Sequence, residues 1–270
     1  MLSQISFLVA TGSVCAEKPA FPPALCKQPP DSEFLVLEQE TDQPLRSYGK
    51  SVPAQLNAAS TVKLALALAL LDDGYSPDTL IEVEDPHIPG TPRKINLSEA
   101  LLYSSNDYFR SLARQKGLAF FRASVDRMGF YPQPLSSNWP GSIDAIAYGG
   151  NATTDPTSQL RFMIRILSRE GGSEATLRPL IRWPMSPDDM DRYPALSLYG
   201  KTGAWNRTVW FVGGARIETQ AGPLWKAMVL VRRGHWKLRN QAIRNFYCRM
   251  GLELPDHPLT RTAIPEAADK

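Results

Sequence analysis

The sequence contains few of the residues from which metal and redox centres are usually built. Its 270 residues include only three cysteines and three histidines, and no C-x-x-C or H-E-x-x-H pattern occurs. With so few cysteines and histidines, a metal site made of Cys and His is nearly excluded. We expect the protein to need no cofactor.

A strong excess of charge and a long apolar run are missing as well. The net charge of +3 is too mild to indicate nucleic-acid binding, which needs a clustered basic stripe. No stretch of about 18 apolar residues occurs, so we expect no membrane span once a signal is removed. With 43% hydrophobic and 21% charged residues, the chain is no disordered tail or fibre and can bury one large core or two small ones.

The first residues are typical of an export signal. Residues 5–14 are mostly apolar or small and end in Val14-Cys15-Ala16, which predicts a secretory signal peptide over residues 1–16. No Lys or Arg precedes the apolar run, and a buried N-terminal strand is the alternative. A cleaved signal would make the mature protein periplasmic or secreted.

Cleavage after Ala16 would also change the cysteine count. It removes Cys15 and leaves Cys26 and Cys248, an even pair in an oxidising compartment. We predict a disulfide that joins the two ends of the mature chain. Two unrelated buried thiols are the alternative.

Apolar periodicity and turn residues divide the remaining chain into strands near both ends and helices between them. A Pro-rich, irregular leader over residues 17–33 precedes them. The expected strands cover residues 34–38, 45–48, 195–199, 208–217 and 224–232. The expected helices cover residues 60–71, 97–128 (with stops at Gly117 and Gly129), 157–169 and 238–250, and loops are expected over 76–96 and 131–155. This order indicates one α+β unit whose sheet is assembled from both termini.

The segment over residues 60–71 (STVKLALALALL) carries two conflicting signals. Leu and Ala alternate with period 2, as in a strand, but both are strong helix formers without β-branching. We therefore predict a buried helix, which ends at Asp72-Asp73-Gly74.

Three short motifs occur in order along the chain. They are Ser60-Thr61-Val62-Lys63 (S-x-x-K), Ser104-Ser105-Asn106 (S-x-N) and Lys201-Thr202-Gly203 (K-T-G). Singly the first two are weak, because each is expected about once by chance in a chain of this length. A nucleophile with a lysine three residues later needs a helix, which puts both side chains on one face. The first motif opens the predicted buried helix and so satisfies this condition.

Two further matches to these patterns are less favourable. Ser47–Lys50 also fits S-x-x-K, but it contains Gly49 and lies just before Pro53, so a loop is expected there. Ser136–Asn138 also fits S-x-N, but it runs into Trp-Pro-Gly and is expected to be a surface turn. Ser104–Asn106 instead lies between two helical patterns, where a short connection can direct both side chains inward.

The ordered motifs and their surroundings resemble the transpeptidase domain of penicillin-binding proteins and the class D β-lactamases. The resemblance is carried by AASTVKLALALALLDDG, INLSEALLYSSNDYF, AYGGNATTDPTSQL and YGKTGAW followed by VWFVGG. It implies an α+β (α/β/α) fold with an antiparallel sheet built from both termini, flanking helices and an all-helical subdomain. The implied catalytic domain covers residues 34–250, with residues 60–170 as its mainly helical part and residues 251–270 as a C-terminal tail.

The resemblance also implies serine acyl transfer. A serine hydroxyl becomes nucleophilic when a base takes its proton, and Ser60 with Lys63 would be this pair. Burial and the second cation, Lys201, would lower the pKa of Lys63. Ser104 would relay the proton to the leaving group, and Asn106 would bind the substrate's amide and hold Lys63.

Substrate binding would fall to the K-T-G segment. Lys201 and Thr202 would bind the terminal carboxylate of the substrate or of a β-lactam, and Gly203 would let the substrate backbone come close. The backbone N–H groups of Ser60 and Ala204 would form an oxyanion hole. The candidate catalytic residues are thus Ser60, Lys63, Ser104, Asn106 and Lys201, and the candidate substrate-binding residues are Thr202, Gly203 and Ala204.

Deacylation separates the enzymes within this superfamily. Class A β-lactamases use a Glu with an Asn four residues later, and neither Glu170 nor Glu174 has such an Asn. Class D enzymes use a carbamylated lysine at the Lys63 position, steadied by a Trp in a W-x-x-G motif before K-T-G. The only W-x-x-G here, Trp210–Gly213, follows K-T-G, and Tyr148–Gly150 matches the class D Tyr-Gly-Asn imperfectly. Slow deacylation by water is therefore expected.

The leading hypothesis is a secreted D,D-peptidase or transpeptidase-like enzyme that acts on peptidoglycan stem peptides and is acylated by β-lactams. A class D-like β-lactamase is one alternative. A non-catalytic module that senses or binds peptidoglycan or β-lactams is another. Other cell-envelope proteins are further candidate partners, and nucleic acid is not.

Other interpretations of the same residues are weaker. Gly200-Lys201-Thr202 does not complete a P-loop, because Ala195 stands where Gly is needed and a strand pattern follows. No G-x-S-x-G occurs for a Ser-His-Asp hydrolase. Trp210-Phe211 is expected in the core, and the three histidines, His87, His235 and His257, at the surface. Basic residues near the C-terminus are expected to form a solvated face or, alternatively, to contact anionic envelope polymers: Arg232, Arg233, Lys237, Arg239 and Arg244.

Overall fold

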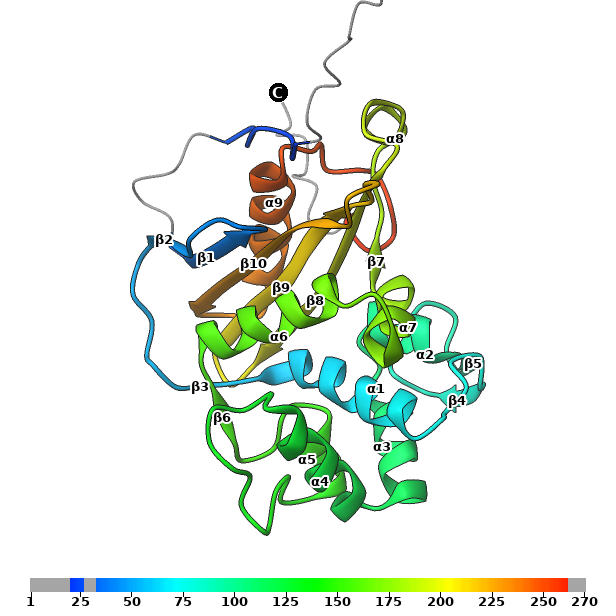
Figure 1. The fold of residues 1–270 in the computed structure, drawn as a ribbon. Coiled ribbons are helices and arrows are strands. Elements are labelled where there is room, and N and C mark those ends of the chain that lie inside the picture. Colours follow the sequence, from blue (N-terminus) through cyan, green and yellow to red (C-terminus); the bar gives the residue numbers. More distant parts are fainter. Residues whose placement is uncertain (1–19, 27–32, 262–270) are drawn as a thin grey trace, which may run out of the picture.

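A six-stranded antiparallel sheet forms the centre of the molecule. The computed structural model describes residues 20–26 and 33–261, and its main sheet has the strand order β2-β1-β10-β9-β8-β7. The strands are β1 (Leu35–Glu40), β2 (Arg46–Gly49), β7 (Arg182–Trp183), β8 (Leu196–Trp205), β9 (Thr208–Ile217) and β10 (Leu224–Arg233). β1 pairs with β10, with Leu35 opposite Val231, so segments from both ends of the chain lie side by side (Figure 1). The prediction of an antiparallel sheet built from both termini is confirmed.

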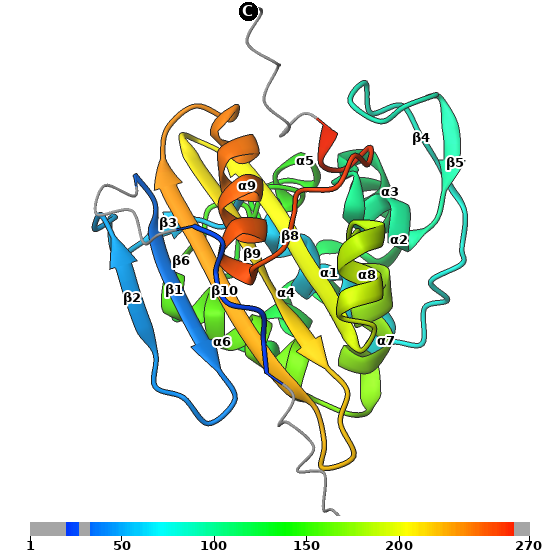
Figure 2. The same cartoon turned by 90° about the horizontal axis from the view of Figure 1, so that it is seen from above.

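Helices cover both faces of this sheet. Figure 2 shows α9 (Leu238–Met250) across one face, with α6 (Pro156–Ser168) and α1 (Val62–Asp72) on the opposite side. Strand residues alternate between two buried apolar clusters. In β9, Trp210 belongs to the cluster beside α1 and α6, and Phe211 belongs to the cluster beside α9. The expected core position of both residues and the three-layer α+β arrangement are thus confirmed.

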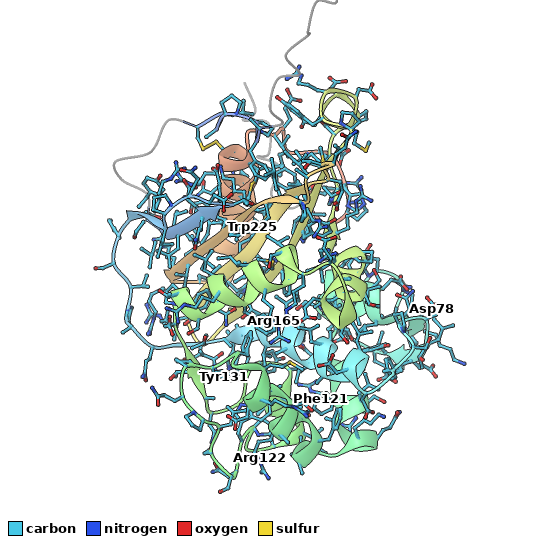
Figure 3. The ribbon with its side chains drawn as sticks, in the orientation of Figure 1. Asp78, Phe121, Arg122, Tyr131, Arg165 and Trp225 are labelled. Atoms are coloured by element: carbon cyan, nitrogen blue, oxygen red, sulfur yellow. A yellow bond between two sulfur atoms is a disulfide. The ribbon has the colours of Figure 1, made fainter. Side chains whose placement is uncertain are left out.

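A mainly helical part packs on the side of α1 that faces away from the sheet (Figure 1). Its helices are α2 (Leu97–Leu102), α3 (Asn106–Lys116), α4 (Leu118–Met128) and α5 (Ile143–Ile146), and α7 (Gly172–Leu180) and α8 (Pro187–Arg192) follow α6. Two small sheets pair β3 (Leu56–Asn57) with β6 (Thr153–Thr154) and β4 (Ile81–Val83) with β5 (Arg93–Ile95). Figure 3 places Phe121 and Tyr131 in the helical part, where both are buried, and Trp225 on the sheet.

Helix α1 is buried on every side. Each residue from Val62 to Leu70 is buried, Lys63 included. Because no face of α1 meets water, its sequence needs no polar stripe of helical period, and the Leu/Ala alternation is compatible with a helix. The predicted buried helix is confirmed, and so are the helices expected over 97–128, 157–169 and 238–250.

Some boundaries differ from the expectations. β8 continues to Trp205, well beyond the strand expected over 195–199, because its glycines let neighbouring groups pack closely: a Cβ at Gly200 would lie 2.8 Å from Cζ of Phe211. The segment Ser47–Gly49 is no loop, since its backbone pairs with β1 as edge strand β2. The loops expected over 76–96 and 131–155 contain the β4–β5 hairpin, α5 and β6, and α7, α8 and β7 were not anticipated.

The two chain ends are joined covalently. Cys26 and Cys248 form a disulfide across 222 residues of sequence, which confirms the predicted link. The backbone N–H of Leu25 donates to the carbonyl of Cys248 at 2.9 Å, so this part of the leader lies against the end of α9. The predicted signal peptide, with Cys15, lies outside the described residues. Across the described ranges, no helix combines the length and the apolar character needed to cross a membrane.

Candidate active site

The three sequence motifs converge on one cavity of about 480 Å³. The S-x-x-K serine lies in the 3₁₀ turn η1 (Ala59–Thr61) that opens α1, the S-x-N residues lie between α2 and α3, and K-T-G lies in β8. Six of the eight predicted site residues line the cavity: Ser60, Ser104, Asn106, Thr202, Gly203 and Ala204. The other two, Lys63 and Lys201, are buried behind its wall.

The turn that carries Ser60 is held in an unusual conformation. Ala59 has φ of +50°, in the left-handed region that a residue with a Cβ rarely adopts. The Oδ1 atom of Asn57 accepts a hydrogen bond from the backbone N–H of Ala59 at 2.7 Å, which fixes this turn. One helical turn later, the Nζ atom of Lys63 lies 3.2 Å from the Oγ atom of Ser60. The structure therefore places the serine and the lysine on one face, as the spacing predicts.

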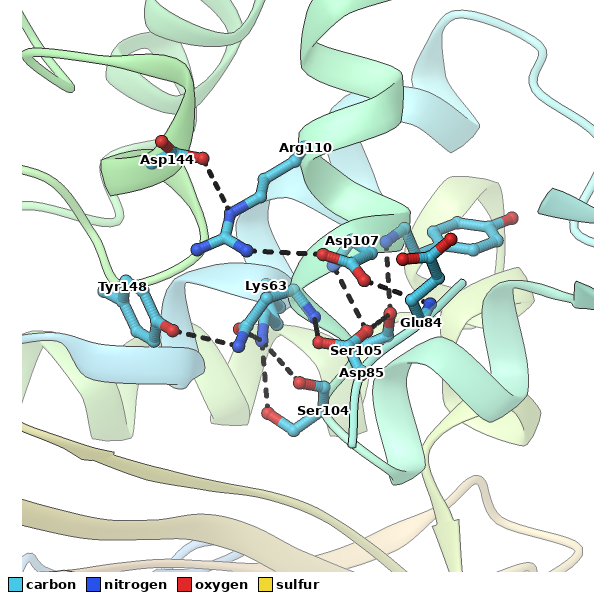
Figure 4. A network of polar contacts seen from close by, with 11 residues as sticks. Lys63, Glu84, Asp85, Ser104, Ser105, Asp107, Arg110, Asp144 and Tyr148 are labelled. Carbon is cyan, nitrogen blue, oxygen red and sulfur yellow. Dashed lines mark hydrogen bonds and ion pairs between the residues drawn. The ribbon is translucent and has the colours of Figure 1, made fainter. Parts of the chain in front are cut away.

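Lys63 is the centre of the polar network in Figure 4. Its Nζ atom donates to the carbonyl of Ser104 at 2.8 Å and to Oδ1 of Asn106 at 2.7 Å, and it lies 3.3 Å from the Oγ atom of Ser104. Burial lowers the pKa of Lys63 to about 7; the carboxylate of Asp85 opposes this shift, and the cation of Arg110 adds to it. An amine that is half neutral near pH 7 lies within reach of two hydroxyl groups.

The S-x-N turn is organised by Asp85, a residue that the sequence did not single out. The carboxylate of Asp85 accepts the hydroxyl hydrogen of Ser105 and the backbone N–H groups of Asn106, at 3.0 Å, and Asp107, at 3.2 Å. Ser105 in turn caps α3 by accepting from the N–H of Tyr108 at 3.1 Å. Ser104 has φ of +64°, which turns its hydroxyl and its carbonyl toward Lys63.

The amide of Asn106 joins Lys63 to an aromatic pair. Its Nδ2 group donates to the hydroxyl of Tyr148 at 3.0 Å, on the side opposite to Lys63. The ring of Tyr148 stacks on the indole of Trp205, with centroids 4.1 Å apart and an interplanar angle of 15°. The guanidinium of Arg110 lies over the ring of Tyr148, 5.9 Å from its centroid, and forms an ion pair with Asp144 at 3.1 Å. The Tyr-Gly-Gly segment was the only sequence signal for Tyr148.

The K-T-G segment packs directly against the turn that carries Ser60. A Cβ at Gly203 would lie 3.2 Å from the backbone nitrogen of Ser60 and 3.1 Å from Cγ2 of Thr61, so a side chain here would be tight unless β8 or the Ser60 turn shifted by a few tenths of an ångström. Lys201 is 2% exposed. Burial, followed by the charges of Lys63 and Arg239, lowers the pKa of Lys201 well below its ordinary value.

Arg239 corrects one expectation. The basic patch near the C-terminus was expected to be a solvated face, but Arg239 lines the same cavity as Thr202, because the first turn of α9 faces the end of β8. Its Nε atom is buried without a hydrogen-bond partner among the described residues, and burial lowers its pKa. Arg233, Lys237 and Arg244 are exposed, as expected.

The histidines lie mainly outside the network. His87 and His235 are exposed and His257 is half-buried. His87 lies at the rim of the cavity, where its Nε2 atom is 3.0 Å from the carbonyl of Tyr103. Among the residues that the structure describes, no group of three or more His, Cys, Asp or Glu side chains is arranged to hold a metal ion.

A serine and a lysine on the first turn of a buried helix, an S-x-N turn and a K-T-G strand around one cavity define the serine β-lactamase and penicillin-binding protein superfamily. The family model for the penicillin binding protein transpeptidase domain matches residues 19–166, and the chain belongs to this family. The matched part includes Ser60, Lys63, Ser104 and Asn106 and ends before β8. A search of curated protein sequences finds no match.

Solved structures of class D β-lactamases share the fold. The enzyme from Bacillus subtilis superposes with a TM-score of 0.63 at 17% identity, over 81% of this chain and 92% of its own. The enzyme from Fusobacterium nucleatum subsp. polymorphum gives 0.62 at 16% identity, over 79% and 90% of the two chains. YbXI from Nostoc gives 0.61 at 19% identity, over 82% and 94%. At these identities the similarity shows the fold alone.

Proposed function

We propose that the protein is a D,D-peptidase or transpeptidase-like serine acyltransferase that acts on peptidoglycan stem peptides and is acylated by β-lactams. The observation that carries this proposal is the position of Lys63, whose amine contacts the hydroxyls of Ser60 and Ser104 and the amide oxygen of Asn106. Membership of the transpeptidase family supports the same chemistry.

The hydrogen bonds of Lys63 suit a neutral base. The carbonyl of Ser104 and Oδ1 of Asn106 can only accept, so they take both N–H groups of the neutral amine. The nitrogen lone pair then remains for a hydroxyl hydrogen, and the Oγ atom of Ser60 lies 3.2 Å away. In this arrangement Lys63 takes the proton as Ser60 attacks.

The acyl transfer then proceeds in two balanced steps. The Oγ atom of Ser60 bonds to the carbonyl carbon of the terminal peptide bond while its proton passes to Lys63. The C–N bond breaks, and the proton passes by way of Ser104 to the leaving amine, which departs with the terminal residue. In the second step an acceptor amine or a water attacks the ester carbonyl carbon and loses its proton to Lys63. The ester C–Oγ bond then breaks, and Lys63 returns the proton to Oγ, which restores the hydroxyl of Ser60 and the neutral amine.

The oxyanion and the carboxylate would be bound by β8 and its neighbours. The contact between Gly203 and the backbone nitrogen of Ser60 puts the N–H groups of Ser60 and Ala204 on the same part of the cavity, which favours an oxyanion hole. Thr202 and Arg239 both line the cavity, whereas Lys201 is buried behind its wall and burial lowers its pKa. We assign to Thr202 and Arg239 the binding of the substrate's terminal carboxylate.

A class D-like β-lactamase is the second candidate. A pKa of about 7 would let the neutral amine of Lys63 add CO₂ and form a carbamate with loss of a proton, and the fold neighbours are class D enzymes. Against it, the buried indole N–H groups of Trp139, Trp183 and Trp210 all donate to backbone carbonyls rather than to Lys63. None of these three buried indoles, in the part of the chain that the structure describes, therefore serves as the donor that class D enzymes use to steady such a carbamate.

The lifetime of the penicillin adduct separates these candidates. A fluorescent penicillin should label the wild type covalently for many minutes, Ser60→Ala should not be labelled, and Ser47→Ala, in the exposed decoy motif, should be labelled like the wild type. Absence of any adduct at saturating label would refute the acyltransferase. Rapid turnover of a chromogenic cephalosporin that bicarbonate accelerates would instead identify the β-lactamase. An unchanged physiological activity in Ser60→Ala would identify a binding module.

We further propose that the protein is exported, and that its mature chain begins after Ala16. The disulfide between Cys26 and Cys248 supports an oxidising compartment. N-terminal sequencing of the protein recovered from the cell envelope tests the cleavage site. A protein that keeps residues 1–16 and stays in the reducing cytoplasm would contradict it.

A further inference from the structure

A second groove of about 410 Å³ continues the candidate active site beyond Ala204. The two hollows share Tyr148, Ala204 and Trp236 in their walls, so the groove adjoins the cavity that Ser60 lines. Its volume lies within the range of sites for small molecules. We call it the aromatic groove, because four of its nine lining residues have aromatic rings: Tyr148, Trp205, His235 and Trp236.

The aromatic groove holds both of the strongly exposed tryptophans. Among the described residues, Trp205 is 49% exposed and Trp236 is 55% exposed, and both line this groove. Large apolar side chains gathered at one exposed place mark a binding surface. Two partly exposed indoles therefore line a groove that shares three wall residues with the cavity of Ser60.

The walls of the groove are fixed in place. Trp205 stacks on Tyr148, whose hydroxyl is bonded to Asn106. The turn after Trp205 consists of Asn206 and Arg207, both with positive φ, and the carbonyl of Arg207 accepts from the N–H of Gly234 at 2.8 Å. This bond ties the β8–β9 turn to the segment that carries Trp236, so the groove is formed before a ligand arrives.

The direction of β8 indicates which part of the substrate reaches the aromatic groove. In the proposed function, on which this inference rests, Thr202 binds the terminal carboxylate and Ala204 the reacting carbonyl. A substrate that runs along β8 in this order places the rest of its acyl group beyond Ala204, toward Trp205. The aromatic groove therefore lies where the side chain of the acyl donor must go.

The charge of the groove indicates the chemistry of that side chain. None of the residues that line it is acidic, whereas Arg207 is exposed at its edge and has no ion pair within the described part of the chain. We propose that the aromatic groove selects acyl donors whose side chain presents a flat or long apolar body to the two indoles and a carboxylate to Arg207. An ammonium at the same position is disfavoured by the guanidinium.

A series of penicillins with one common nucleus tests this selection. Carbenicillin and ampicillin carry the same phenyl group, with a carboxylate in the first and an amine in the second, and 6-aminopenicillanic acid lacks the side chain. We expect carbenicillin to acylate the protein about 3- to 10-fold faster than ampicillin, because a partly exposed ion pair contributes a free energy of about this size. In Arg207→Ala this ratio should fall toward one, while Arg233→Ala, an exposed arginine outside the groove, should keep it. Trp236→Ala should lower both rates toward that of 6-aminopenicillanic acid.

Equilibrium binding keeps this proposal separate from the proposed function. Quenching of tryptophan fluorescence in Ser60→Ala reports binding without acylation, and it should show the same preference for carbenicillin. Adducts that form at equal rates with all three compounds would overturn the groove and leave the acyltransferase standing. A binding preference in Ser60→Ala without any adduct in the wild type would support the groove and refute the acyltransferase, and neither adduct nor preference would overturn both.

Discussion

The protonation of Lys63 offers the sharpest test of the site. Burial lowers its pKa from 10.5 to about 7. At pH 7 about half of the amine is then neutral, compared with about 3 in 10,000 for an unperturbed lysine. The buried position therefore increases the fraction of neutral amine at pH 7 about a thousandfold. For a step in which the neutral amine accepts a proton, this corresponds to an activation free energy that is about 4 kcal/mol lower.

This argument predicts the pH dependence of acylation. The second-order rate constant for labelling by penicillin should rise about tenfold per pH unit between pH 5 and 6.5 and level off above pH 8. Lys63→Arg should lose about a thousandfold or more at pH 7, because a guanidinium does not release its proton. Lys50→Arg, in the exposed decoy motif, is the matched control and should leave the profile unchanged.

A rate constant that stays flat from pH 5 to pH 8 would refute the assignment of Lys63 as the base. A wild-type profile retained by Lys63→Arg would refute it as well. Thermal unfolding, measured in parallel, shows whether each variant is folded at the pH of the assay.

The lowered pKa of Lys63 should also make the stability of the fold depend on pH. The folded-state pKa of Lys63 lies below the unfolded value of 10.5, so between pH 7 and 10.5 the unfolded chain binds more protons at this position. The free energy of unfolding therefore rises with pH across this window, by at most about 1.4 kcal/mol per unit from Lys63. Chemical denaturation should show this component in the wild type and a reduced slope in Lys63→Met.

Three further predictions concern the support of the site. Asp85→Asn removes a carboxylate that holds the S-x-N turn, so it should lower the free energy of unfolding by about 2–4 kcal/mol. The same carboxylate opposes the downward pKa shift of Lys63, so its loss should also move the midpoint of the acylation pH profile to lower pH. Asp78→Asn, at an exposed position, is the control and should change neither the denaturation curve nor the pH profile. Gly203→Ala pushes a methyl group against the nitrogen of Ser60, so it should reduce acylation by at least tenfold in a labelling assay, and a fully active variant would contradict the close packing. Replacing both Cys26 and Cys248 by Ser should lower the free energy of unfolding by about 2–5 kcal/mol, measured in urea, and an unchanged midpoint would show that the link adds no stability.

The parts of the site that were predicted from sequence lie on local motifs. Ser60 and Lys63 are three residues apart on a helix, Ser104 and Asn106 share one turn, and the K-T-G residues share one strand. In such cases spacing fixes which side chains lie together. The sheet built from both termini was accessible for a similar reason, since its strands carry runs of Val, Trp and Phe that a helix would not favour.

The supporting residues were missed because tertiary structure alone brings them to the site. Asp85 lies in a polar segment that resembles a loop, and its role depends on three donors about twenty residues away in sequence. Arg239 belongs to a run of basic residues that resembles a solvated face, and only the direction of α9 turns it inward. The strand β8 was predicted too short, because its glycines weaken strand propensity while the fold needs them for close packing.

The pairing of β1 with β10 has a consequence for how the chain acquires its structure. Leu35 can pair with Val231 only once β10 has been synthesised, and β8 must pack against the turn of Ser60. An N-terminal fragment that ends with α6 contains Ser60, Lys63 and the S-x-N turn, but it lacks β8 and the strand β10 that pairs with β1. The candidate active site is therefore complete only in the fully paired sheet, and we expect its assembly to wait for the long-range pairing of β1 with β10.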